Sequence, residues 1–243
     1  MCTLSWTRSA HGYVLLFNRD ERLARPNADP PTRQTVAGVR ILAPVDPAAG
    51  GTWIGVNHHG VTAALLNRYD DAPVDPAAGS VSRGILLRSL LAARSAQATV
   101  AAAADRSLGA FQPFTVAAFD RGARAWLADW NGRTLTRSAV EDAGLVRTSS
   151  RRDQAEAERS RSAVLAAMAS GIRPSPALLR AFHQSHQPER GPFSVCMHRD
   201  EAATRSLTMV RLGRRHATMW YWHGAPCTNP VVTRRRLRLA VGG

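Results

Sequence analysis

The first twenty-one residues predict a β-hairpin, and this hairpin constrains the fold more than any other stretch. Residues 2–7 alternate with β-prone side chains, residues 13–18 are a mostly apolar run, and residues 9–12 are typical of a turn. Pairing about that turn places Cys2 opposite Asn18 or Arg19, depending on the register. In the Arg19 register one face of the hairpin carries Cys2, Leu4, Trp6, Leu15 and Phe17. That face predicts burial against another layer, with a thiol delivered next to a cation and two carboxylates.

Cys2 combines two reactive groups once the initiator methionine is removed, and the small size of cysteine favours that removal. The thiol is a nucleophile, and the freed α-amine, with a pKa of about 7.7–8.0, is a base. The competing interpretation is that Cys2 is a small buried hydrophobe. The location of Cys2 at position 2 favours the interpretation as a nucleophile, because an internal cysteine has no free α-amine to act as its base.

The four residues at positions 18–21 read Asn-Arg-Asp-Glu, and the chain resembles the NRDE-motif family, which includes transport and Golgi organisation protein 2. The resemblance covers nearly the whole chain. The other matching segments are residues 1–2, 25–26, 50–57 with Gly60, 66–68, 194–199 and 224–227.

The resemblance implies a branch of the N-terminal nucleophile (Ntn) hydrolase fold: a four-layer αββα sandwich of two antiparallel sheets flanked by helices. The order of predicted elements, two strand-rich segments separated by helices, independently indicates an α+β chain rather than a doubly wound one. We expect a single NRDE domain over residues 1–243, with residues 230–243 as a basic, solvated tail.

The resemblance implies a site built on Cys2. The catalytic candidates are Cys2, Arg19, Asp20 and Asn67. The substrate-binding candidates are Asn18, Glu21, Gly50, Gly51 and Trp53. A second predicted hairpin, residues 52–57 and 61–67, places Asn67 near the two glycines, which allow close backbone approach to a ligand or only a bend before a strand.

Two interpretations of the charged residues stay open. Arg19 would lower the pKa of the thiol and hold a substrate carboxylate in its fork, or it would form a structural ion pair with Asp20 or Glu21. In the related choloylglycine-hydrolase branch an arginine and an aspartate also follow the terminal cysteine, but with a different spacing. Whether Asp20 or Glu21 orients the site is therefore open. Asn67 is the candidate oxyanion donor, with Asn18 as the alternative.

The leading hypothesis is a hydrolase that attacks a non-peptide amide (C–N) bond of a small amide or anionic substrate and needs no cofactor. The alternative is a non-catalytic protein of haem or lipid binding and trafficking on the same fold, for which haem is the implied ligand. His198 has two interpretations: a residue that binds haem or lines the wall of a site, or a core histidine whose hydrogen bonds are satisfied within the protein. We prefer the second.

The net charge of +14 comes entirely from arginine, because the chain has no lysine. We interpret this as a compositional bias. Attraction to anions is the alternative. No helix-turn-helix, zinc-finger or aromatic RNA-binding signature is present, so no specific nucleic-acid partner is expected.

The three cysteines, Cys2, Cys196 and Cys227, are odd in number and widely spaced. This spacing predicts neither a disulfide framework nor a zinc cluster, and no metal site is expected. We find no signal peptide and no apolar run of about eighteen residues, so we expect a soluble cytoplasmic protein without a membrane span. The oligomeric state is left open.

The local patterns predict further elements between these motifs. Residues 22–32 are expected to be a loop and residues 36–42 a short strand, while residues 44–50 and 73–79 are similar loops. Strands are expected at 114–119, 125–130, 133–136, 145–148, 193–197, 206–212 and 217–222. Helices are expected at 80–93, 96–105, 153–170 and 175–186.

Overall fold

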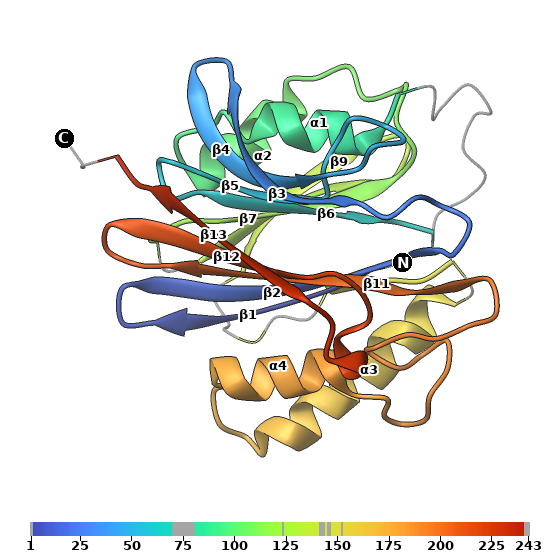
Figure 1. Cartoon of the computed structure of the whole chain (residues 1–243). Helices are drawn as coiled ribbons and strands as arrows, with labels where there is room; N and C mark the ends of the chain where they lie inside the picture. Colours follow the sequence, from blue (N-terminus) through green and yellow to red (C-terminus); the bar gives the residue numbers. More distant parts are fainter. Residues whose placement is uncertain are drawn as a thin grey trace.

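Two antiparallel sheets lie face to face and are covered on their outer sides by helices (Figure 1). The computed structural model describes residues 2–69, 81–122, 124–140, 144, 147–151 and 153–240. Sheet A has the strand order β10-β1-β2-β11-β12-β13, and sheet B has the order β3-β4-β5-β6-β7-β8-β9. This is the αββα arrangement that the family resemblance implied.

The strands of sheet A come from both ends of the chain and from its middle. They are β1 (Cys2–Ser9), β2 (Gly12–Arg22), β10 (Arg147–Ser149), β11 (Ala202–Leu212), β12 (His216–Trp222) and β13 (Val232–Arg238). The strands of sheet B are β3 (Asp29–Val36), β4 (Val39–Val45), β5 (Ile54–Asn57), β6 (Thr62–Asn67), β7 (Phe114–Phe119), β8 (Ala125–Trp130) and β9 (Leu135–Val140).

Among the described residues, four α-helices form the outer layers, and a polar side chain caps the start of each. Helices α1 (Arg83–Leu90) and α2 (Ala96–Ala104) pack on sheet B, and helices α3 (Gln154–Ala169) and α4 (Pro176–Gln184) pack on sheet A (Figure 1). The caps are Ser82, Ser95, Asp153 and Ser175, each of which accepts a backbone N–H of the first turn. None of the helices in the described parts of the chain is long and apolar enough to span a membrane.

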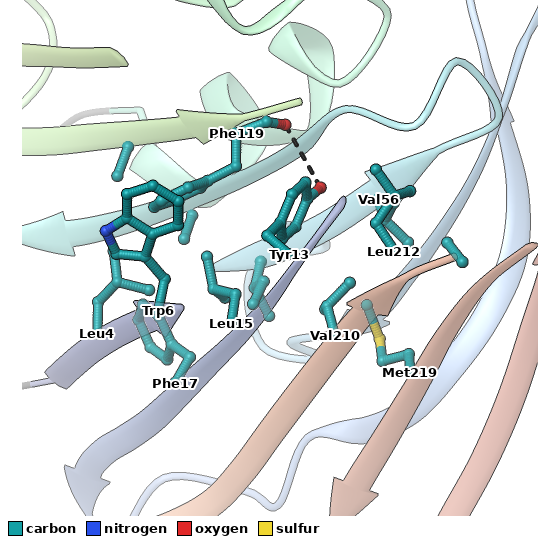
Figure 2. Close-up of a cluster of buried hydrophobic side chains, with 14 of the residues drawn as sticks. Leu4, Trp6, Tyr13, Leu15, Phe17, Val56, Phe119, Val210, Leu212 and Met219 are labelled. Carbon is teal, nitrogen blue, oxygen red and sulfur yellow. Dashed lines mark hydrogen bonds between the residues drawn. The ribbon is translucent and has the colours of Figure 1, made fainter. Parts of the chain in front are cut away.

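The N-terminal hairpin has the register in which Cys2 pairs with Arg19. Odd-numbered side chains of β2 therefore point between the sheets and even-numbered ones point toward α3 and α4, because successive side chains of a strand alternate. Figure 2 shows the inner face, where Leu4, Trp6, Leu15 and Phe17 meet side chains of sheet B.

A tyrosine joins the two sheets within this core. The hydroxyl of Tyr13 donates to Thr62 Oγ1 at 2.6 Å and lies 3.4 Å from the carbonyl oxygen of Phe119 (Figure 2). A buried hydroxyl needs such partners, because leaving it without a hydrogen bond costs about 1–3 kcal/mol.

Two local predictions were wrong. Residues 22–32 are not all loop, because β3 begins at Asp29. Its two prolines, Pro30 and Pro31, are tolerated at the edge of sheet B, where the register with β4 is irregular. Residues 193–197 form bends rather than a strand. The N–H of Cys196 donates to Ser185 after α4, and the carbonyl of Val195 accepts the side chain of Asn18. Of these backbone groups, the carbonyl of Met197 accepts an N–H from β11, that of Thr204.

The expected C-terminal tail is also corrected. Residues 232–238 form β13, the edge strand of sheet A, which pairs with β12. Leu237 and Leu239 are buried in the core between the sheets and anchor the end of this arginine-rich segment. The other predicted strands and helices are present within a few residues, except that Ser80, residues 73–79 and residues 145–146 lie outside the described residues.

We expect the stability of the fold to depend on pH through a buried histidine, His183. His183 of α4 is fully buried, and its Nε2 lies 2.8 Å from the hydroxyl of Ser5. Burial, and secondarily the charge of Arg161, lowers the pKa of His183 to about 3, whereas the pKa of a histidine in the unfolded chain is about 6.5. The contribution to stability is complete above pH ~6.5 and is lost as the pH falls toward 3, because only the unfolded chain takes up the proton.

Below pH ~6.5 we expect the free energy of unfolding to fall by up to about 1.4 kcal/mol per pH unit. Denaturant unfolding at pH 7 and pH 5 measures the change, and His183→Gln should remove about 2 kcal/mol of it. His11→Gln, at an exposed position of the first turn, is the control and should follow the wild-type protein. Equal pH dependence in wild type and His183→Gln would contradict the prediction.

Candidate active site

A pocket of about 230 Å³ opens beside Cys2 at the end of the paired strands. Its lining combines β1 and β2 of sheet A with β6 of sheet B and the start of α1. The predicted residues that line it are Cys2, Arg19, Asp20, Glu21, Gly51, Trp53 and Asn67.

The thiol of Cys2 is buried and lies among charged groups. Burial raises the pKa of Cys2, the carboxylate of Asp20 raises it further, and the charge of Arg19 and a hydrogen bond from the Asp20 backbone lower it. A thiolate at this position therefore needs a base close by, because the thiol is the stable form of a desolvated cysteine.

Arg19 is held in place by two carboxylates and an indole ring. Its Nη2 lies 3.3 Å from Glu21 Oε2 and 3.2 Å from Asp46 Oδ2, and its guanidinium carbon stacks 4.6 Å from the centre of the Trp53 ring. Of the two interpretations given above, the geometry favours the ion pair, with Glu21 and with a partner that the sequence did not single out.

That partner, Asp46, is a residue that sequence reasoning missed. It binds Arg19 and also Arg25, whose Nη2 lies 2.7 Å from Asp46 Oδ2. Asp46 follows β4 in one of the two similar loops, and its spacing carried no signal because its partners are more than twenty residues away.

The NRDE residues point to opposite faces of sheet A. Arg19 and Glu21 face the pocket, whereas the side chain of Asn18 points outward, where its Nδ2 donates to the carbonyl oxygens of His183 and Val195 at 2.9 Å. The assignment of Asn18 to substrate binding is therefore corrected. Strand alternation, together with the Arg19 register, excludes it from the pocket.

Asp20 lines the pocket where its backbone bonds to Cys2, while its carboxylate points outward like the side chain of Asn18. Its Oδ1 accepts the hydroxyl of Thr204 at 2.7 Å, and its Oδ2 lies 3.7 Å from Nη2 of the fully buried Arg161. Arg161 was missed although a signal existed. It occupies a position on α3 in line with the buried Ala157, Val164 and Leu165, and an arginine within an apolar helical stripe indicates a buried charge partner.

The two glycines do not act alike. Gly51 lines the pocket, but the close approach that it allows is to α1, since a Cβ there would lie 2.4 Å from the carbonyl carbon of Gly84. Gly50 has a positive φ of 65° in the turn and is not among the lining residues. Gly51 thus lines the pocket, as expected, and also admits α1, whereas the expectation that Gly50 makes room for a ligand is corrected to a turn.

An adjoining pocket of about 870 Å³ shares Asp20, Glu21, Arg25, Asn67 and Arg83 with the first. Burial lowers the pKa of Arg83 at the start of α1, and the negative charge of an ionised Cys2 acts in the opposite direction. Arginines outnumber carboxylates in this lining: Arg22, Arg25, Arg83, Arg151 and Arg199 face Asp20, Glu21 and Glu201. The larger pocket is therefore suited to an anionic group.

The other two cysteines lie together on the far side of sheet A. Cys196 and Cys227 are gathered with His186 and His198, and the potential ligand atoms of all four lie within 4.8 Å of one another. The wide spacing of the three cysteines along the chain predicted no metal site. Spacing does not report contacts made by tertiary folding, and these four side chains lie close enough together to hold a metal ion.

Comparisons with known proteins bear on the family of the chain and on its fold. A sequence model of the family described as Transport and Golgi organisation 2 matches residues 1–138. No curated protein sequence matches the chain.

Solved structures show the same fold at low sequence identity. Penicillin V acylase from Agrobacterium tumefaciens superposes with a TM-score of 0.60 at 12% identity, over 96% of this chain and 85% of that one. An N-acylethanolamine-hydrolyzing acid amidase from Caenorhabditis elegans gives 0.57 at 12% identity, over 86% and 92%. A mutant conjugated bile acid hydrolase from Clostridium perfringens gives 0.57 at 10% identity, over 100% and 97%.

Proposed function

Because the chain belongs to the Transport and Golgi organisation 2 family and has the fold of Ntn hydrolases, we propose that it hydrolyses a non-peptide amide bond with Cys2 as nucleophile. The observation that carries the proposal is the pocket in which Cys2 meets Arg19, Asp20 and Asn67. The three fold relatives named above are described as an acylase, an amidase and a hydrolase, which supports the same reaction class.

In the proposed first step the sulfur of Cys2 attacks the carbonyl carbon of the amide. The α-amine of Cys2, freed by removal of Met1, takes the thiol proton and passes it to the leaving nitrogen, so that a C–S bond forms while the C–N bond breaks. Water then attacks the thioester carbon, the carboxylic acid leaves, and the thiol regains a proton.

The remaining residues take roles that their contacts support. Asp20 orients the α-amine, since its charge acts on the thiol whereas the carboxylate of Glu21 is engaged by Arg19 and Arg25. Asn67 has two amide N–H groups, of which one donates to the hydroxyl of Tyr69 at 2.9 Å. The other is the proposed donor to the oxyanion.

Processing of the N-terminus tests the mechanism directly. We expect intact mass spectrometry of the purified, active protein to show loss of Met1, because a methionine on the α-nitrogen would remove the base. Treatment with an electrophilic acyl probe should then add one acyl group, which peptide mapping places on Cys2. Fully active protein that retains Met1 would contradict the mechanism. Labelling confined to Cys196 or Cys227 would favour a binding protein on this fold.

The arginine-rich pocket predicts a preference for substrates with an acidic group. We expect Arg83→Gln to slow labelling by a carboxylate-bearing acyl probe about 10–100-fold, since a hydrogen bond to a charged group contributes about 1.5–3 kcal/mol. Labelling by a neutral probe of the same shape should change less than about twofold. Arg88→Gln, at an exposed position on the same helix, is the control. Equal slowing of both probes would show that Arg83 acts on the structure of the site and not on the anion.

A further inference from the structure

Four side chains with metal-binding atoms converge on the outer side of sheet A. Nε2 of His198 lies 3.2 Å from Nε2 of His186, 3.4 Å from the sulfur of Cys227 and 3.6 Å from the sulfur of Cys196. None of the four lines either pocket beside Cys2. The cluster is therefore separate from the candidate active site.

Hydrogen bonding alone does not account for this convergence. A neutral imidazole nitrogen offers either one proton or one lone pair, so Nε2 of His198 cannot form good hydrogen bonds to three partners at once. A cation at the centre of the cluster would satisfy all four groups together.

The distances fit a tetrahedral ion. With bond lengths of about 2.0–2.1 Å to nitrogen and about 2.3 Å to sulfur, the edges of a zinc tetrahedron are about 3.3 Å between two nitrogens and about 3.5 Å between nitrogen and sulfur. The three distances around His198 lie close to these values.

The fold brings the ligands from three separate segments. His186 follows α4, Cys196 and His198 lie in the bends before β11, and Cys227 lies in the short 3₁₀ helix η1 (Pro226–Thr228). Backbone bonds hold these segments together: the N–H of Cys196 donates to the carbonyl oxygen of Ser185 at 2.9 Å. The side chain of Gln184 likewise donates to the carbonyl oxygen of Pro226 at 3.1 Å.

We propose that His186, Cys196, His198 and Cys227 bind a single Zn²⁺ ion in a closed site with four protein ligands. Two thiolates and two imidazoles in tetrahedral reach are a ligand set typical of structural zinc, and the two thiolate charges neutralise the ion. Four protein ligands leave no open position for substrate, so the role is to tie the segments together.

The protonation of the ligands is compatible with metal loading. Burial lowers the pKa of His198, which keeps the ring neutral, and burial raises the pKa of Cys196, so that zinc must displace a proton there. Nη2 of Arg190 donates to Nδ1 of His198 over a long 3.4 Å. With zinc on Nε2 the proton moves to Nδ1, and the exposed Arg190 turns away into solvent.

The site supports the strand that carries the NRDE residues. The segment between its ligands includes Val195, whose carbonyl accepts the amide of Asn18, and Met197, whose N–H donates to Thr204 Oγ1 at 2.8 Å. Thr204 in turn donates to Asp20. Zinc would thus hold the outer partners of Asn18 and Asp20 in place.

Cobalt(II) titration of the reduced, chelator-treated full-length protein tests the site. We expect the visible absorption of a tetrahedral cobalt site together with a thiolate-to-cobalt charge-transfer band, saturating at one ion per chain and displaced by Zn²⁺. Cys196→Ser and Cys227→Ser should each weaken cobalt binding at least about 100-fold, because loss of even an outer-shell partner costs about 10–100-fold.

Two matched variants and one further ligand variant keep the test specific. Cys2→Ser removes the third thiol and should leave the cobalt spectrum unchanged, and Arg190→Ala should bind cobalt as tightly as wild type or more tightly. His198→Gln, checked for folding by circular dichroism, should weaken the charge-transfer band as the cysteine variants do. A reduced wild-type protein without a thiolate-to-cobalt band would overturn the proposal, as would a band that survives in both Cys196→Ser and Cys227→Ser.

Discussion

Cys2→Ser is expected to slow acylation at residue 2 by about 10²–10⁴-fold while the protein stays folded. A serine hydroxyl remains protonated at neutral pH and the α-amine is only a weak base toward it, so the proton transfer that supports the attack is lost. The substitution changes little in volume, and the residue sits at the start of an edge-proximal strand whose backbone pairs with β2 and β10. Intact mass spectrometry over time, with an electrophilic acyl probe, measures the rate.

The melting temperature separates this chemical effect from unfolding. We expect Cys2→Ser to melt within a few degrees of wild type, whereas an unfolded variant would lose labelling for an unrelated reason. His11→Gln, at an exposed position in the turn of the same hairpin, is the control and should be labelled like wild type. Undiminished labelling at residue 2 of Cys2→Ser would refute the thiol of Cys2 as the nucleophile.

Arg161→Met is expected to lower the free energy of unfolding by about 3–5 kcal/mol, the largest stability effect that we anticipate. The guanidinium is fully buried, donates from Nη1 to Thr3 at 2.6 Å, and lies 3.7 Å from the carboxylate of Asp20. Methionine keeps much of the volume but removes the guanidinium that faces this buried carboxylate. The melting temperature should fall by roughly 6–20 °C, at about 2–4 °C per kcal/mol for a chain of this size.

A double-mutant cycle identifies the cause of the loss. Adding Asp20→Asn to Arg161→Met should restore part of the stability, because the buried negative charge is then removed together with the guanidinium. Arg159→Met, on the same helix but exposed, should change stability by no more than about 0.5 kcal/mol. If Arg161→Met were as stable as Arg159→Met, charge pairing would not be what holds α3 on sheet A.

The sequence predicted the parts of the site that depend on neighbours along the chain. Alternation of apolar residues on the hairpin favoured the register in which Cys2 meets Arg19, because any slip by one residue would expose the whole apolar face. The second hairpin similarly placed Asn67 at the end of sheet B. The two-sheet architecture came from the resemblance of the motifs together with the order of the elements.

The sequence alone determined which residues could meet within each hairpin, since strand period and turn position are local properties. Only the tertiary structure decided which groups meet across the layers. Asp46 reaches Arg19 from sheet B, and Arg161 reaches Asp20 from a helix more than 140 residues away. Cys196 and Cys227 meet because the bends before β11 and η1 are both held at the end of α4. Such contacts depend on how whole layers pack, and that packing is set by the summed burial of many side chains rather than by any spacing in the chain.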